Sequence, residues 1–193
     1  MAQHDTASSI TDLVERLGRL VRSSGYAHGL NPAQWEALRY LGRCNGFSNN
    51  PSALASFLSA TKGTVSQTVS SLERKGLLIK TPRAGQGRAL SLVLTTKGRA
   101  VLDCDPIADL KAAATELGSD AATLDGQLKH LLAECQALYG VRTFGKCRTC
   151  RYFMERVPEE ASDRCSLMGT LIDADGADQI CAEHTPQEMA GIR

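Results

Sequence analysis

Four cysteines near the end of the chain restrict how its last segment folds. Their spacing is C-x2-C-x14-C-x15-C, formed by Cys147, Cys150, Cys165 and Cys181. The large apolar groups around them are few, namely Phe144, Tyr152, Phe153, Val157, Leu167, Met168, Leu171 and Ile180. A segment with so small an apolar core commonly needs a metal or a cross-link to fold. We therefore expect residues 141–193 to form a module held together by these sulfur atoms.

The spacing of the four cysteines bears on which metal they bind. The C-x2-C pair is a knuckle whose thiolates meet on one ion or cluster, and the two later cysteines complete a four-thiolate set. Structural zinc sites usually supply two close pairs, and pairing Cys181 with His184 would leave Cys165 unused. The pattern favours an iron–sulfur cluster of unspecified type, with zinc as the alternative cofactor. A thiol switch, unrelated cysteines or a disulfide are the remaining alternatives. His184 is expected beside the site or at the surface, not as a ligand.

Composition and hydropathy indicate an ordinary globular protein, with 42% hydrophobic and 22% charged residues. Apolar runs such as 89–94 are far shorter than the roughly 20 residues needed to cross a bilayer. The first residues lack the basic and apolar regions of a secretory signal. We expect a cytoplasmic protein without membrane contact, where clustered thiols are better read as metal ligands or redox groups than as disulfides.

Charge is distributed unevenly along the chain. Residues 61–100 hold eight of the 22 basic residues but only one of the 21 acidic residues, Glu73. A basic block in an otherwise acidic chain is the electrostatic footprint of binding to a phosphate backbone.

Apolar periodicity predicts a mainly helical fold. Residues 8–22 carry an apolar stripe, and further helices are expected after Asn31-Pro32, from Pro51, and from Thr61 to about Lys75. A helix from Thr95 should continue to Leu117 with a kink at Pro106, and a leucine-striped helix should run from about residue 120 to 140. The helices between the first and the last form a small domain, called the reader below. Because this domain leaves the first and last stripes uncovered, we expect them to pair with a second copy. Closure into an intramolecular bundle is the alternative.

The helix that begins at Thr61 has two different faces. Val65, Val69 and Leu72 lie on one side, and small, polar or cationic side chains lie on the other. Such side chains enter a major groove without steric conflict. Two strands, near 77–80 and 89–94, flank a turn-rich segment and predict a wing. The predicted DNA-contacting residues are Thr61, Lys62, Gly63, Thr64, Ser66, Gln67, Ser70, Arg74 and, at the wing tip, Arg83 and Arg88.

Three segments in this order resemble the MarR family of winged helix-turn-helix regulators. They are 31–41 (NPAQWEALRYL), 61–77 (TKGTVSQTVSSLERKGL) and 87–98 (GRALSLVLTTKG). The resemblance covers roughly residues 8–139. It implies a homodimer formed by the terminal helices, the helix from Thr61 in the major groove, the wing at the minor groove, and a possible small phenolic effector. The family's wing usually has an acidic residue two positions before its arginine, where this chain has Gln86.

The predicted architecture is mainly α, with a winged helix-turn-helix and dimerisation domain over 1–140 and a small cysteine-ligated appendage over 141–193. The expected function is sequence-specific binding to a palindromic operator, as a repressor, controlled by an iron–sulfur cluster that senses redox state or iron. We expect changes at the cluster to alter how the appendage packs on the helix around Leu124–Leu138. A structural zinc with an organic effector is the alternative, and a redox enzyme or electron carrier a remote one. No nucleophile–base pair or nucleotide motif favours an enzyme.

Three further cysteines lie outside the spaced set. Cys135 falls on an apolar helical stripe, where a small buried residue is the simplest explanation. Cys44 and Cys104 show no partner spacing and are given no role.

Overall fold

The computed structural model describes residues 2–83, 89–157, 162–173 and 175–187. The helices are α1 (Ala2–Ser24), α2 (Pro32–Leu41), α3 (Pro51–Phe57), α4 (Lys62–Arg74), α5 (Thr96–Leu102), α6 (Ala108–Thr115) and α7 (Asp120–Tyr139), with two short 3-10 turns, η1 (Cys147–Thr149) and η2 (Gly176–Asp178). The strands are β1 (Leu78–Pro82), β2 (Leu90–Leu94), β3 (Gly145–Lys146), β4 (Phe153–Val157), β5 (Ser162–Cys165), β6 (Thr170–Ile172) and β7 (Ile180–Cys181).

Polar side chains cap the four helices of the N-terminal core. Asn31 and Gln34 form a reciprocal capping box at α2, and Asn50 accepts a hydrogen bond from the Ala53 amide at α3. Thr61 and Thr95 cap α4 and α5 in the same way. Each cap pairs a backbone N–H that would otherwise lack a partner in the first helical turn. The helix starts expected at Asn31 and Thr61 are confirmed.

The core lies where α2, α3, α4 and the β1–β2 hairpin meet. Its fully buried side chains include Trp35, Tyr40, Leu54 and Leu72, and Val65 and Val69 of α4 are also buried there. This confirms the predicted inner face of α4. Complete burial of such large side chains supplies most of the favourable free energy of folding.

The predicted wing is confirmed as an antiparallel hairpin whose register runs from Leu78 opposite Leu94 to Pro82 opposite Leu90. Its base packs tightly on α5. A Cβ atom at Gly98 would lie 1.9 Å from the Leu77 carbonyl oxygen, so only glycine permits this approach. Residues 84–88 at the wing tip, with Gln86 and Arg88, lie outside the described residues.

The helix expected from Thr95 to Leu117 is instead two helices, and the prediction of one kinked helix is wrong. The chain turns between α5 and α6 because Pro106 has no N–H to donate. Asp105 also accepts a hydrogen bond from the Ile107 amide (3.0 Å) and forms a two-point ion pair with Arg39 of α2, at 2.8 and 2.6 Å. These contacts hold the turn against the core.

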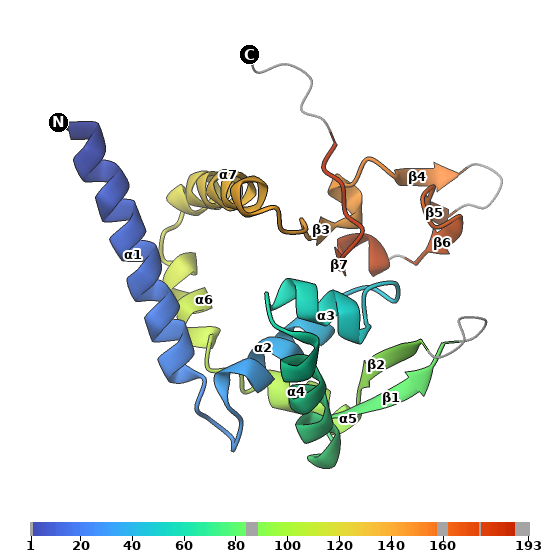
Figure 1. Ribbon diagram of the computed structural model, residues 1–193. Helices are drawn as coiled ribbons and strands as arrows, with labels where there is room; N and C mark the ends of the chain where they lie inside the picture. The colour runs from blue at the N-terminus through green and yellow to red at the C-terminus, as the bar shows by residue number, and fades with distance from the viewer. Residues whose placement is uncertain (1, 84–88, 158–161, 174, 188–193) are drawn as a thin grey trace.

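The appendage begins after α7 and packs on the N-terminal core. It holds the two-stranded β3–β7 sheet and the three-stranded β4–β5–β6 sheet, both antiparallel. Phe144 contacts Tyr40 of α2 and Phe57 of α3 in edge-to-face arrangements, with centroids 6.1 and 5.1 Å apart. Ile180 and Ala182 also join the main apolar core. Figure 1 shows the appendage, in orange and red, beside α3.

The terminal helices leave their apolar stripes in solvent. Ile10, Leu13, Val14, Leu17 and Leu20 of α1 are exposed, and so are Leu124, Leu128, Leu131, Leu132 and Leu138 of α7. In Figure 1, α1 extends away from the core around α2, α3 and α4. The intramolecular bundle, which was the alternative to pairing with a second copy, is therefore not formed by the described residues. Among the described residues, no helix is long and apolar enough to span a membrane.

Asp105→Asn is expected to lower the free energy of unfolding by about 1–3 kcal/mol, because it breaks a largely buried charged hydrogen bond. Burial alone would raise the pKa of Asp105, but its hydrogen bonds to Arg39 bring that pKa below the ordinary 3.8. The stabilisation is thus present above pH 3.8 and lost as the pH falls through the lower folded pKa. Urea unfolding at pH 7 measures the loss, with the exposed Asp103→Asn as control. Equal stability of the two variants would contradict the assignment.

Candidate nucleic-acid interface and four-cysteine site

The outer face of α4 is the first candidate site. Seven of the residues predicted to contact DNA are exposed there, and Ser70 is half-buried. The exposed ones are Thr61, Lys62, Gly63, Thr64, Ser66, Gln67 and Arg74. The face carries short polar groups and two cations, which leaves room for close approach of a flat or grooved partner.

The cations around α4 differ in what they bind. Lys80 pairs with Glu73 at 2.6 Å, which neutralises the single acidic residue of the basic block. Lys75 donates to the Gly29 carbonyl. Lys62 and Arg74 have no ion-pair partner in the described part of the chain. Their charges remain open to an external anion.

Arg83 of the wing lies against the protein. Its Nη2 atom donates to the carbonyl oxygens of Gly46 (2.8 Å) and Phe47 (3.2 Å) and to Asn49 Oδ1 (2.7 Å). Its Nε atom donates to Ser91 Oγ at 3.0 Å. The guanidinium that sequence analysis assigned to DNA is held on the loop between α2 and α3. Contact of Arg83 with DNA stays a prediction.

The four spaced cysteines line one small cavity in the appendage. Pairing of β3 with β7 places Cys181 opposite Gly145, next to the knuckle of Cys147 and Cys150. Pairing of β4 with β5 places Cys165 opposite Phe153. The cavity is otherwise walled by Phe47, Tyr152, Phe153, Leu167, Met168, Ile172 and Glu183. All seven cysteines of the chain are free thiols, so a disulfide is not formed here.

Hydrogen-bond donors surround the sulfur atoms. Asn45 Nδ2 donates to Cys147 Sγ at 3.4 Å, and the Thr185 amide donates to Cys150 Sγ at 3.5 Å. The interaction between the Cys147 and Cys181 side chains lowers the pKa of Cys181 and raises that of Cys147. One of these sulfurs is thereby prepared to lose its proton, as a metal ligand must.

The arrangement fits a metal centre in donor type but not yet in geometry. No three His, Cys, Asp or Glu side chains, in the part of the chain that the structure describes, are placed as ligands of one ion. Four soft donors on one apolar cavity, with N–H groups directed at two of them, are the chemistry of a thiolate-bound zinc or iron–sulfur group.

Charged groups near the cavity are partly engaged elsewhere. Lys146 and Arg148 both pair with Asp178, at 3.5 and 3.1 Å. His184 does not line the cavity, and its Nε2 atom bonds Thr149 Oγ1 at 3.0 Å. Its Nδ1 atom is buried without a hydrogen-bond partner among the described residues. His184 therefore lies beside the cavity, and the expectation that it is not a ligand stays a prediction.

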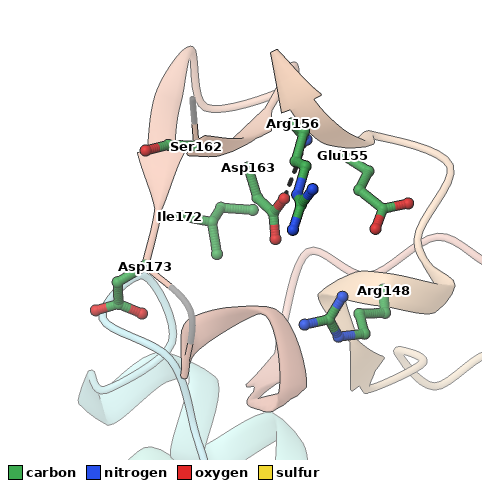
Figure 2. A pocket seen from close by; sticks show the side chains of 7 residues that line it. All are labelled: Arg148, Glu155, Arg156, Ser162, Asp163, Ile172 and Asp173. Atoms are coloured by element: carbon green, nitrogen blue, oxygen red, sulfur yellow. Dashed lines mark hydrogen bonds between the residues drawn. The ribbon is translucent and has the colours of Figure 1, made fainter. Parts of the chain in front are cut away.

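A second pocket lies across Ile172 from the thiols. Figure 2 shows its lining, in which Arg156 lies beside Asp163, and Arg148, Glu155 and Asp173 lie farther out along the walls. The Arg156 amide donates to Asp163 Oδ1 at 3.1 Å. Ile172 belongs to the walls of both pockets and is almost fully buried. It separates the thiols from this charged pocket.

The appendage contacts the reader at a place that sequence analysis missed. Its backbone binds the loop after α2: the Ile180 amide donates to the Arg43 carbonyl (2.8 Å), and the Asn45 amide donates to the Ile180 carbonyl (2.9 Å). The expectation that the appendage packs on Leu124–Leu138 is wrong, because those leucines are exposed. No periodicity or spacing marks Asn45 as a partner of a cysteine so distant in the chain.

Helices α3 and α4 with the β1–β2 hairpin define a winged helix-turn-helix fold. The model of the MarR family matches residues 28–89, and proteins of that family are transcription regulators, not enzymes. A crystal structure of a MarR family transcription regulator is similar with a TM-score of 0.55 and 18% identity, covering 72% of this chain and 91% of that one.

Two further solved structures share the fold. MepR of S. aureus in a MepR–DNA complex gives a TM-score of 0.54 at 18% identity, covering 68% of this chain and 98% of that one. Apo wild-type MarR from E. coli gives 0.52 at 23% identity, covering 65% and 96%. Among curated proteins, no sequence matches the chain.

Anaerobic loading with iron and sulfide, or with zinc, is expected to give one centre per chain. Cys165→Ser and Cys181→Ser should each lower the bound metal at least about tenfold, because a thiolate ligand is lost. Elemental analysis and the visible spectrum measure this, and absorbance distinguishes a cluster from colourless zinc. Cys104→Ser, at an exposed cysteine away from the cavity, is the matched control. Undiminished metal in Cys181→Ser would rule out the four-thiolate assignment.

Proposed function

We propose that this protein is a cytoplasmic, sequence-specific DNA-binding transcriptional regulator, acting as a repressor, whose DNA binding is controlled by a metal centre on Cys147, Cys150, Cys165 and Cys181. The observation that carries the DNA-binding part is the outer face of α4. It presents small polar side chains together with Lys62 and Arg74, two cations without ion-pair partners in the described chain. The helix behind that face is fixed in a winged helix-turn-helix, and the similar MepR was solved with DNA.

A homodimer is part of the proposal. The exposed stripes of α1 and α7 are long apolar surfaces that a second copy would cover. Two-fold pairing would present two copies of α4 to a palindromic operator, with half-sites one or more helical turns apart. It would also double the number of phosphate contacts, on which affinity depends strongly.

An iron–sulfur cluster is the group we propose for the cysteine cavity. When bound, it supplies a centre whose presence or charge depends on iron supply and redox state. The four thiolates would hold it, and Asn45 and the Thr185 amide would donate hydrogen bonds to two of them. The apolar wall of Phe153, Met168 and Ile172 would limit access of water to it.

A structural zinc with an organic effector is the competing assignment. A cleft between α1 and α6, lined by Leu17, Leu20, Val21, Pro106, Ile107 and Leu110, offers apolar walls for such a ligand. Protein purified without oxygen decides between the two, since a visible chromophore favours the cluster and a colourless zinc protein favours the effector.

Two substitutions on α4 test the DNA-reading face. Lys62→Ala should weaken binding to all duplexes about equally and reduce the salt slope by about one, as expected for a lost phosphate contact. Gln67→Ala should instead reduce the preference for a selected duplex over random DNA, by about 1–3 kcal/mol. Fluorescence anisotropy at several salt concentrations measures both effects, with Lys111→Ala on α6 as control. Unchanged affinity and preference in both variants would remove the reading role of α4.

Leu13→Glu is expected to convert the dimer to a monomer, because it places a charge within the apolar stripe of α1. Leu171→Glu is the matched control: both leucines are 52% exposed in a single chain, but Leu171 lies on the appendage. Sedimentation velocity measures the change. A Leu13→Glu protein that stays dimeric would show that α1 is not in the interface.

A further inference from the structure

The loop between α2 and α3 touches the cysteine cavity on one side and the wing on the other. It spans residues 42–50, and in Figure 1 it lies between the appendage and the β1–β2 hairpin. Asn45 and Ser48 are buried within it, which is unusual for polar loop residues. Their burial is explained by the hydrogen bonds that they make.

On the appendage side, the loop binds both backbone and sulfur. The Ala182 amide donates to Ser48 Oγ at 2.8 Å, next to Cys181. Asn45 Nδ2 donates to Cys147 Sγ, and the Phe47 side chain forms part of the cavity wall. The loop thus supplies one wall of the thiol site, although it belongs to the reader.

Asn45 links the sulfur to the shape of the loop. While its amide nitrogen donates to Cys147, its Oδ1 atom accepts from the Phe47 amide (3.2 Å) and the Ser48 amide (3.1 Å). A primary amide is planar, so the two ends cannot turn independently. The position of the sulfur therefore sets the direction of the turn at 45–48.

On the wing side, the same turn holds Arg83. Its guanidinium donates to the carbonyl oxygens of Gly46 and Phe47 and to Asn49 Oδ1. The Leu92 amide of β2 donates to the Asn49 carbonyl at 2.7 Å. Both strands of the wing are thus tied to the loop, β1 through the residue that follows it and β2 directly.

We propose that this loop is a relay that couples the occupancy of the four-cysteine site to the position of the wing. The route runs from Cys147 Sγ through Asn45 and the turn of residues 46–49, which includes the Asn49 side chain, to the guanidinium of Arg83. The inference rests on the proposed function, because it requires a metal centre on the cysteines. Coordination of a metal by Cys147 would fix the position of its Sγ atom, and with it the hydrogen bond from Asn45 and the turn that binds Arg83. Removal of the metal loosens this hold.

In this relay, Arg83 holds the wing on the loop and does not serve as a phosphate contact. A substitution at Asn49 distinguishes these two roles of Arg83. Asn49→Ala removes one hydrogen-bond acceptor of Arg83 but leaves the positive charge of Arg83 in place. Asn49 does not line the thiol cavity, so this substitution leaves the cavity wall unchanged. Asn45→Asp interrupts the other end, since it keeps the oxygen acceptor but removes the donor to Cys147. Arg151→Gln, an exposed cation of the appendage outside the route, is the control.

The test compares full-length protein loaded anaerobically with iron and sulfide to the same protein after chelation. The DNA is a duplex selected from a random pool by both forms, and anisotropy gives the ratio of their dissociation constants. We expect a ratio of at least about fivefold in wild type and Arg151→Gln. In Asn49→Ala this ratio of dissociation constants should fall below about twofold, while the iron content stays unchanged. The same fall in the ratio is expected in Asn45→Asp. Should Asn45→Asp lose iron, Asn49→Ala carries the test.

The outcomes separate the relay from the proposed function. If loading changes DNA affinity at least about fivefold in wild type and also in Asn49→Ala, the relay is wrong, and control of DNA binding by the metal stands. If the metal does not change affinity in wild type, control of DNA binding by the metal is wrong. Hydrogen exchange at the Leu92 amide then decides the relay. Greater protection on loading in wild type but not in Asn45→Asp or Asn49→Ala supports it, and equal protection overturns it.

Discussion

The structure depends on the pairing of Ile180 with the backbone that follows α2. Through its amide and carbonyl, Ile180 bonds Arg43 and Asn45 and extends the reader by one short strand of the appendage. This pairing places Cys181 near the core and brings Phe144 onto Tyr40 and Phe57. A segment with too few apolar groups for its own core thereby shares a larger one.

Two surfaces of opposite character follow from the way the helices use their apolar sides. In α4 the apolar side is buried in the core, which leaves a polar and cationic face exposed to solvent. In α1 and α7 the apolar side lies outside the core, and most of its large side chains stay exposed. The first surface suits a hydrated polyanion, and the second suits another apolar surface.

Local features of the sequence predicted most of the reader. The 3.6-residue period placed Val65, Val69 and Leu72 inside, and Asn31 and Thr61 marked helix starts, because periodicity and caps involve neighbours in the chain. The break before α6 was missed because Arg39 reaches Asp105 from another helix. The contact of Asn45 with Cys147 joins residues 102 positions apart, and no local pattern encodes such a contact. The spacing of the cysteines predicts a shared site, which stays a prediction, and it does not indicate the surface on which they rest.

The close approach of Gly98 to Leu77 has a mechanical consequence. Because Gly98 leaves no room for a side chain, α5 packs directly against the residues that join α4 to the base of the wing. The ion pair between Arg39 and Asp105 extends this rigid body to the turn before α6. Any rotation that changes the spacing between two such readers in an assembly must therefore take place beyond Asp105. The short connection into α6 is the place where a pivot has to be sought.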